Sequence, residues 1–406
     1  MKFFKHIGPA TFITAAFIGP GTVSTCALAG IHHGYSLIWV MIISLIMTLF
    51  LQELVTRLAI LYQKDLTELV VINFIEKRFF KIGMITLIFL AIVIGNTAYE
   101  AGNISGVNIG LQILGYNDFF ISLYDTKINY AVLIIAGLAF FILNLRSHKS
   151  IEKSLMLLVG ILSLSFLILA FVTTQSSIAV IKGIFSPGLF HTDLLLIAAL
   201  IGTTVVPYNL FLHSALAREK WKNSEGIKSM RIDTAIAVSL GILVSISIII
   251  TTANIADSLA SVNNLGVALE PVLGKFSSYL MGIGFVSAGL TSAITAPLAA
   301  AFVINKLFKL NYSTTSFAFK RLSYAILIIG GVIAAFDFNP VEVIKSAQVA
   351  NAIILPLIVF MIIWISQNKP DKNKFYRPSL ILGIILFLLS VLLSFTSIAK
   401  VFEFVT

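Results

Sequence analysis

Charged residues are scarce in this chain. Asp, Glu, Lys and Arg make up 11% of the 406 residues, hydrophobic residues make up 58%, and the mean hydropathy is +1.00. A water-soluble chain of this length could not bury so much apolar side-chain surface in its core. The composition therefore excludes an ordinary soluble protein and indicates a chain that folds in lipid.

Cysteine is scarcer still, because Cys26 is the single one. Disulfides within the chain and metal sites built from several thiolates are therefore excluded. The sequence also lacks a nucleophile triad, a phosphate-binding loop and a cluster of metal ligands, so we expect no enzymatic activity and no cofactor. The net charge of +10 does not indicate a nucleic-acid partner, because the basic residues form short clusters between apolar runs.

Apolar runs of about twenty residues recur from end to end, and this is the length that crosses a hydrocarbon core of about 30 Å. We expect a single all-α integral membrane domain over 1–406. Its spans are predicted at about 7–30, 35–61, 83–114, 129–146, 152–174, 193–217, 234–253, 276–304, 322–336, 340–366 and 378–397. The first run is interrupted by Gly19-Pro20-Gly21, and ten more follow it, so we interpret it as a retained helix rather than a cleaved signal.

The basic residues predict how the chain is oriented. Of the 28 Lys and Arg residues, 22 fall at the amino terminus or in the alternate connections that share its side, and only Lys127, Lys182, Lys275 and Lys400 fall on the other. Cytoplasmic loops carry the excess of Lys and Arg. We expect a multi-pass protein of the cell membrane with a cytoplasmic amino terminus and an external carboxyl terminus, either monomeric or weakly associated.

Two spans carry residues that break a helix. The first contains Gly19-Pro20-Gly21-Thr22 and the sixth contains the stretch 202–209, which includes Pro207. Five helices separate the breaks, as expected for inverted repeats at about 7–174 and 193–366 followed by an extra helix at about 378–397. Paired breaks in corresponding spans indicate a transporter's binding site. The alternative is a pair of kinks whose freed backbone groups bond to neighbouring helices.

Several stretches then resemble a known family of transporters. They are 7–10, 34–37 and 51–58 in the first two spans, 205–214 (VVPYNLFLHS) in the sixth, 288–292 (AGLTS) in the eighth and 346–349 (SAQV) in the tenth. They resemble the Nramp (natural resistance-associated macrophage protein) family of divalent-metal and proton symporters, over essentially the whole chain. The resemblance implies a leucine-transporter-like fold and secondary transport by alternating access, driven by an ion gradient.

The resemblance also implies where the substrate binds, and there the sequence departs from the family. The family holds its metal with an Asp and an Asn in the first break and a Met in the second, whereas this chain has Gly19, Thr22 and Val206. Tyr208 replaces the family's His after the proline. The expected substrate-binding residues are Gly19, Gly21, Thr22, Val206, Tyr208 and Gln348. A dehydrated divalent ion needs several oxygen, nitrogen or sulfur ligands, so we expect no metal site of the family's kind.

Four residues are candidates for ion coupling. Alignment with the family's acidic pair in the third span gives Glu100 and Asn103, and Glu100 alternatively forms a structural salt bridge. Lys345 lies one turn before Gln348, where its charge would repel a divalent metal or pair with Glu100 or a substrate carboxylate. His213 matches a family histidine and either relays a proton or packs between helices.

Glu53 and Arg57 have the spacing of an intrahelical ion pair at the end of the second span, and we interpret the pair as structural.

Three functions remain open from the sequence. The first is an ion-coupled carrier of a small organic zwitterion or anion, such as an amino acid, held by the helix ends at the breaks. The second is an importer of Mn²⁺, Fe²⁺ or hydrated Mg²⁺ with relaxed ligation. The third is a sensor that keeps the transporter fold and moves nothing.

The predicted orientation can be tested by cysteine labelling. A cysteine placed near Lys220 should react with a membrane-impermeant maleimide only after the cells are permeabilised, because Lys220 belongs to the basic connections predicted to be cytoplasmic. Reaction in intact cells would reverse the predicted orientation.

Overall fold

The structure is a computed structural model. It describes residues 9–10, 18–73, 78–116, 119–123, 126–145, 149–174, 176–185, 193–254, 265–268, 270–314, 316–336, 338–368 and 377–405. Most of the first half of the predicted first span and the basic residues Lys2, Lys5, Lys77, Arg146, Lys369, Lys372 and Lys374 lie outside these ranges.

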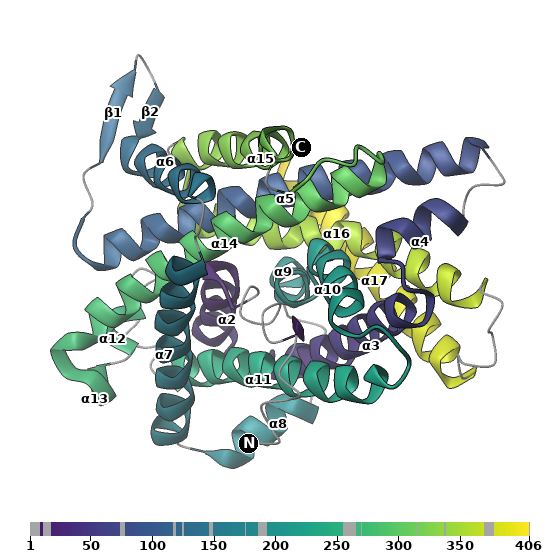
Figure 1. Ribbon diagram of the computed structural model, residues 1–406. Coiled ribbons are helices and arrows are strands. Elements are labelled where there is room, and N and C mark those ends of the chain that lie inside the picture. The colour runs from purple at the N-terminus through teal and green to yellow at the C-terminus, as the bar shows by residue number, and fades with distance from the viewer. Residues whose placement is uncertain are drawn as a thin grey trace.

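The described chain is almost entirely helical (Figure 1). The long helices are α3 (Ile38–Tyr62), α5 (Arg78–Ile113), α6 (Tyr130–Asn144), α7 (Lys149–Thr173), α11 (Gly226–Asn254), α14 (Ser277–Leu307), α15 (Phe317–Ala335), α16 (Pro340–Gln367) and α17 (Arg377–Val405). The helices beside the predicted breaks are α2 (Pro20–His33), α9 (Leu194–Thr204) and α10 (Pro207–Lys220). The short elements are α4 (Leu66–Asn73), α8 (Ser177–Phe185), α12 (Leu265–Ala268), α13 (Glu270–Leu273) and η4 (Gly274–Phe276).

The helices correspond to the predicted spans. In the described part of the chain, nine helical segments are long and apolar enough to cross a membrane, with α9 and α10 counted as one, and α6 is a shorter apolar helix. Together with the first span, which α2 continues, they agree with the predicted count of about eleven. The sequence did not predict the short helices or an antiparallel hairpin of β1 (Phe120–Leu123) and β2 (Thr126–Asn129).

Side-chain caps mark where several helices begin. The side chain of Asn129 accepts hydrogen bonds from the first amides of α6, and Asp193, Ser316 and Asn339 do the same for α9, α15 and α16. These residue types are the preferred N-caps because a side-chain oxygen satisfies an amide that has no partner within the helix.

The broken helices occupy the middle of the bundle. In Figure 1, α2, α9 and α10 lie between α5 and α14 on one side and α3 and α11 on the other. Contacts of α2 and α3 with α11, of α10 with α3, and of α14 with α5 agree with this arrangement. The chain breaks are therefore enclosed by intact helices, as non-helical backbone at membrane depth requires.

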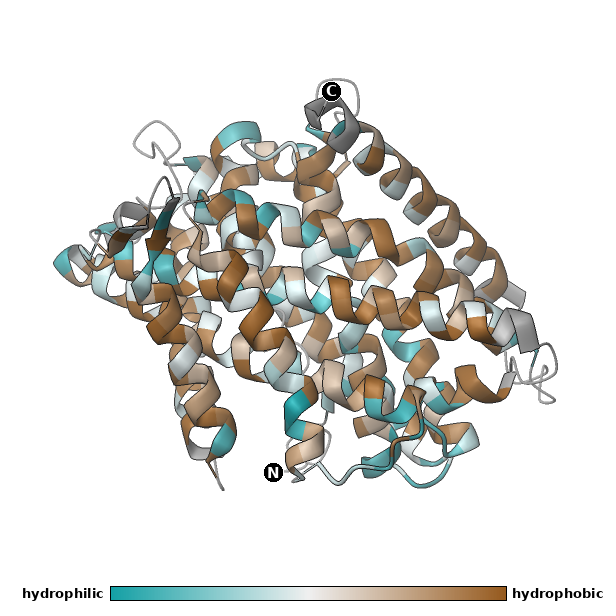
Figure 2. Ribbon diagram, turned by 90° about the horizontal axis from the view of Figure 1, so that it is seen from above, coloured by the Kyte–Doolittle hydropathy of each residue, from teal (hydrophilic) through white to brown (hydrophobic). Residues whose placement is uncertain are grey.

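Apolar side chains cover the outer faces of the spans. Leu157 and Phe171 on α7 and Phe395 on α17 are largely exposed. Figure 2 shows hydrophobic residues along most of the length of the long helices and more hydrophilic residues toward their ends. Such a surface is unfavourable in water and suits hydrocarbon, as the composition predicted.

Glycine allows α2 to lie directly against α11. A Cβ built on Gly30 would lie 2.0 Å from the Thr252 Oγ1 and 2.5 Å from the Ile249 carbonyl oxygen. Because the carbonyl belongs to the backbone of α11, a side chain at position 30 would force the two helices apart.

This contact makes a stability prediction. Gly30→Ala should lower the thermal unfolding midpoint in detergent, with a cost of about 1–3 kcal/mol from overpacking. The control is Gly83→Ala on α5, where a Cβ meets no atom within 4 Å and alanine favours the helix. Equal midpoints for the two variants would show that α2 and α11 do not need this close approach.

Candidate functional site

The first break lies at Gly19. Ile18 and Gly19 are not helical, and Gly19 has an extended backbone with φ −103° and ψ −175° immediately before α2. Pro20 has no amide hydrogen, and the first main-chain bond runs from the Val23 amide to the Gly19 carbonyl at 3.1 Å. Proline suits the first position of a helix, where amides have no partner within the helix. The amides of Gly21 and Thr22 therefore stand at the open end of α2.

The second break lies at Val205 and Val206. Both have non-helical backbones, and they separate the end of α9 at Thr204 from the start of α10 at Pro207. Because Pro207 has no amide hydrogen, the carbonyl of Thr203 has no donor four residues ahead of it. The second predicted break is therefore confirmed, and α9 ends with carbonyls directed towards the gap.

A hydrogen bond joins the two breaks. The hydroxyl of Thr22 at the start of α2 lies 2.8 Å from that of Thr203 near the end of α9, and both residues are fully buried. Thr22 was predicted as a site residue from the sequence and Thr203 was not. The only sequence signal for Thr203 is its position four residues before Pro207.

Gln348 of α16 closes the same space. A Cβ built on Gly21 would lie 2.2 Å from the Gln348 Nε2, and one built on Gly202 would lie 2.0 Å from the Gln348 carbonyl oxygen. Gln348 is buried, and its Oε1 has no hydrogen-bond partner. The structure therefore brings Gly21, Thr22 and Gln348 together, as the sequence predicted, and adds Thr203 to them. A buried amide oxygen without a partner is available to a bound molecule.

Tyr208 and Val206 continue this site along α10. The Tyr208 ring packs edge-to-face against Tyr99 of α5, with centroids 5.5 Å apart and planes at 64°. Val206 is buried at the break and offers no ligand atom. The aromatic pair therefore joins α10 to α5 beside the second break, and Tyr99 is a partner of Tyr208 that the sequence did not indicate.

Glu100 and Asn103 are buried on α5, which also carries Tyr99 of this aromatic pair. The Asn103 Nδ2 lies 3.5 Å from the Glu100 Oε2. A Cβ built on Gly330 of α15 would lie 2.7 Å from the Cβ and the Cγ of Glu100. The aliphatic part of the Glu100 side chain therefore packs against α15. No salt bridge to Glu100 is recorded in the described residues, so the structural ion pair considered from the sequence is not found there.

His213 lies on α10 one turn beyond Asn209. Both residues are fully buried, and no polar atom of either side chain has a hydrogen-bond partner in the structure. The sequence left open a histidine held between helices by hydrogen bonds, and this geometry does not provide those bonds. Unpaired polar atoms in a dry interior are costly, so this part of α10 is suited to receive water or an ion.

The structure gives Lys345 a different partner from Glu100, the one considered from the sequence. Its Nζ lies 3.5 Å from the Asp193 Oδ2, with side chains 21% and 39% exposed. The other oxygen of Asp193 caps α9 by accepting from the amides of Leu195 and Leu196. Lys345 therefore does not pair with Glu100. Its charge is balanced by Asp193, where α9 and α16 begin. The sequence missed this pair because helical spacing relates Lys345 only to other residues of α16, whereas Asp193 lies at the start of α9.

The opposite end of the bundle carries a second charged cluster. Arg218 of α10 lies 2.7 Å from Glu68 of α4, and Lys306 of α14 lies 3.2 Å from the same carboxylate. Burial raises the pKa of Glu68, but Arg218 and Lys306 outweigh it, so the net pKa falls below its usual value. Burial raises the pKa of Asp65, the residue that caps α4. The sequence signal for this cap is the D-x-x-E spacing.

The predicted pair on α3 is confirmed. Glu53 lies 3.3 Å from Arg57, one turn along the helix, and 2.8 Å from Arg231 of α11. It ties α3 to α11, in keeping with the structural interpretation.

The arrangement places charge at both ends of the bundle and hydroxyl, amide and aromatic groups at its centre. The central residues named above are all buried, so any bound molecule would be enclosed by α2, α5, α9, α10 and α16. Such a site can hold a small polar molecule by hydrogen bonds and the helix ends.

Comparison with known proteins gives one family over nearly the whole chain. The family model described as natural resistance-associated macrophage protein-like matches residues 10–400. A divalent metal cation transporter MntH of Caldanaerobacter subterraneus is 25% identical over 92% of this chain and 87% of its own length. The MntH of Bacillus subtilis is 28% identical over 89% of this chain and 84% of its own length.

A solved structure has the same fold. The manganese transporter of Eremococcus coleocola, crystallised with an aromatic bis-isothiourea compound, superposes with a TM-score of 0.75. The match covers 98% of this chain and 87% of that one at 20% sequence identity. The leucine-transporter-like arrangement predicted from the sequence is therefore confirmed.

The Lys345–Asp193 pair makes a prediction about access to the central site. Lys345→Met should increase the labelling rate of a cysteine at position 348 by up to about five-fold, because partly exposed ion pairs contribute about 0.2–1 kcal/mol. Asp193→Asn keeps an oxygen that can cap α9 and removes the charge, so it should have the same effect.

A double-mutant cycle supplies the control. The two variants combined should label no faster than either alone, because one pair can be broken only once. Additive effects, or rates equal to that of the parent, would show that the pair does not restrict access.

Proposed function

The chain belongs to the natural resistance-associated macrophage protein (Nramp)-like family. We propose that it is a secondary transporter for a small organic zwitterion or anion, such as an amino acid. Transport rather than catalysis is supported by the names of the relatives, which are transporters. The finer part of the proposal, the substrate class, is supported by the chemistry of the central site.

One observation carries the substrate proposal: the contact between the two breaks is uncharged. Thr22 meets Thr203 by a hydroxyl–hydroxyl bond, and the neutral amide of Gln348 lies against Gly21. A divalent cation loses much of its hydration on entering such a site, and carboxylate ligands normally offset most of that cost. Hydroxyl and amide oxygens without a carboxylate favour a solute of lower net charge.

The helix ends at the breaks match a zwitterion. The amides of Gly21 and Thr22 stand at the positive end of α2, which favours a carboxylate. The carbonyls at the end of α9, near Thr203, stand at a negative end and favour an ammonium group. The unpaired Oε1 of Gln348 is a further acceptor beside them.

The two charged ends fit alternating access. The Asp193–Lys345 pair joins α9 and α16 at one end, and the Arg218–Glu68–Lys306 cluster joins α10, α4 and α14 at the other. α9 and α10 are the two halves of one span, so opening either end can move one half without the other. We assign the two clusters as the gates.

Ion coupling is assigned to the buried ionisable groups near the site. Glu100 lies next to Tyr99 in the sequence, and Tyr99 packs on Tyr208. His213 lies between the second break and the Arg218 cluster along α10. Each can exchange a proton as the gates open, and we propose the proton as the coupling ion.

Divalent metal import is the second candidate, because the relatives are named divalent metal cation transporters. In this chain it would depend on Thr22, Tyr208 and Gln348 holding an ion that keeps part of its water shell, as Mg²⁺ does.

A binding screen separates the two candidates. Purified protein is heated with single amino acids and related zwitterions, and separately with Mn²⁺, Fe²⁺ and Mg²⁺, and the unfolding midpoint is recorded. A ligand that binds only the folded state raises the midpoint. We expect a rise with a zwitterion and none with micromolar Mn²⁺ or Fe²⁺. Saturable Mn²⁺ uptake into liposomes by the unmodified protein would overturn the proposal.

Introducing the family's metal-binding residues should create a metal site in this chain. Gly19→Asp with Val206→Met should create Mn²⁺ binding with a Kd on the order of 10⁻⁴–10⁻³ M, the range of weak carboxylate sites. Lys345 should not prevent it, because Asp193 balances its charge. The matched control is Gly19→Asn with Val206→Met, which keeps the size of the side chain without its charge. Calorimetry that finds equal affinity in both double variants would show that charge is not what the site lacks.

A further inference from the structure

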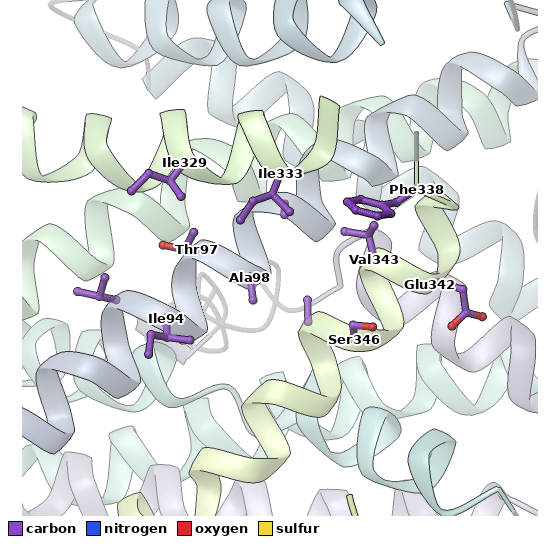
Figure 3. A pocket seen from close by; sticks show the side chains of 12 residues that line it. Ile94, Thr97, Ala98, Ile329, Ile333, Phe338, Glu342, Val343 and Ser346 are labelled. Atoms are coloured by element: carbon purple, nitrogen blue, oxygen red, sulfur yellow. The ribbon is translucent and has the colours of Figure 1, made fainter. Parts of the chain in front are cut away.

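A groove lies between α5, α15 and α16, on the flank of the bundle away from α2 and α9. It has a volume of about 580 Å³, within the range of about 300–1,000 Å³ typical of small-molecule pockets. Figure 3 shows its walls, formed by Ile94 and Ala98 of α5, Ile329 and Ile333 of α15, and Val343 of α16. The walls are almost entirely apolar.

The groove opens to the membrane. Ile94, Ile329 and Ile333 belong to spans, and between 37% and 58% of each is exposed. Phe338, in the link between α15 and α16, closes one end and is itself exposed. In a bilayer, hydrocarbon fills the hollow between the isoleucines, because water would meet few polar partners along these walls.

Polar groups gather where α16 begins. Glu342 lies in the first turn of α16 with an exposed side chain, and Ser346 lies exposed one turn further on. Thr97 of α5 also lines the groove, but it lies beside Ile329 and Ile94, away from Glu342 (Figure 3). Because α16 is a span, its first turn stands near the membrane interface, where lipid head groups lie.

The nearest opposite charge does not neutralise Glu342. Lys345 follows one turn along α16, but its Nζ faces Asp193 of α9 at 3.5 Å, and it does not line the groove. No salt bridge to Glu342 is recorded in the described residues. The rim of the groove therefore carries one negative charge, which attracts a cationic group.

We propose that this groove binds one membrane phospholipid with a primary ammonium head group. The ammonium pairs with Glu342 and one acyl chain fills the space between α5, α15 and α16. A primary ammonium donates hydrogen bonds to a carboxylate and to the Ser346 hydroxyl, whereas the trimethylated head group of phosphatidylcholine has no N–H to donate. Phosphatidylethanolamine is thus the head-group chemistry that fits.

The lipid would contact the helices that line the central site. Ala98 faces the groove and the next residue, Tyr99, packs on Tyr208; Ala347 lines the groove and the next residue, Gln348, contacts Gly21. The lipid and the central site would therefore lie on two faces of the same helices, α5 and α16. A lipid held here restrains the relative movement of α5 and α16.

Native mass spectrometry tests the proposal without a transport assay, so its failure is distinct from failure of the proposed function. Protein is reconstituted in equal mixtures of phosphatidylethanolamine and phosphatidylcholine, extracted, and weighed with its retained lipid. We expect one phosphatidylethanolamine per chain in excess over phosphatidylcholine. Glu342→Gln should lower that retention by up to about five-fold, as loss of an exposed ion pair implies, and Ala98→Phe should remove it by filling the groove.

Two variants serve as controls. Glu219→Gln removes an exposed carboxylate on α10, and Gly160→Phe adds a ring on the exposed face of α7, where a Cβ meets no atom within 4 Å; neither should change retention. Equal retention of the two lipids, or retention unchanged in Glu342→Gln, would overturn the proposal. Glu342 is on the surface, so this variant remains decisive even where Ala98→Phe fails to fold.

Discussion

The fold depends on satisfying backbone polar groups where two spans are interrupted inside the membrane. The non-helical backbone at Gly19 and at Val205 and Val206 interrupts the ladder of helical hydrogen bonds, and Pro20 and Pro207 have no amide hydrogen to continue it. The Thr22 and Thr203 hydroxyls join the breaks side chain to side chain, and intact helices enclose them. The backbone groups at the breaks are thereby kept away from lipid.

Separation of charge follows from that constraint. Ion pairs occur where α9 and α16 begin and where α10 meets α4, and hydroxyls, amides and tyrosines occupy the centre between them. Charges near the interface keep part of their hydration, whereas a charge at the centre needs a permanent partner. Thr22, Thr203 and Gln348 carry no charge, so a ligand released from them would leave no unpaired charge at that contact.

The sequence predicted features that depend on local pattern and missed those that depend on contacts between distant segments. The length of apolar runs gave the helices, and Pro20 and Pro207 with their glycines gave the breaks. The pairing of Lys345 with Asp193 joins positions 152 residues apart, so the helical spacing of Lys345 and Gln348 gave the wrong partner. Thr203 was missed for the same reason. The β1–β2 hairpin is too short for alternating apolar residues to distinguish it from a loop.

The two faces of α5 and α16 link the site to the bilayer. On each helix, two adjacent residues lie on different faces. On α5, Ala98 lines the groove and Tyr99 packs on Tyr208; on α16, Ala347 lines the groove and Gln348 contacts Gly21. Small residues keep α5 and α16 close, since a Cβ built on Gly102 of α5 would lie 3.4 Å from the Ala347 Cβ and 3.5 Å from the Ile344 Cα. If the proposed substrate draws Gln348 towards the breaks, α16 would move as a packed helix and the width of the groove would change with it. The proposed lipid and the proposed substrate would then be coupled through one helix, and that coupling would be reciprocal for their binding free energies.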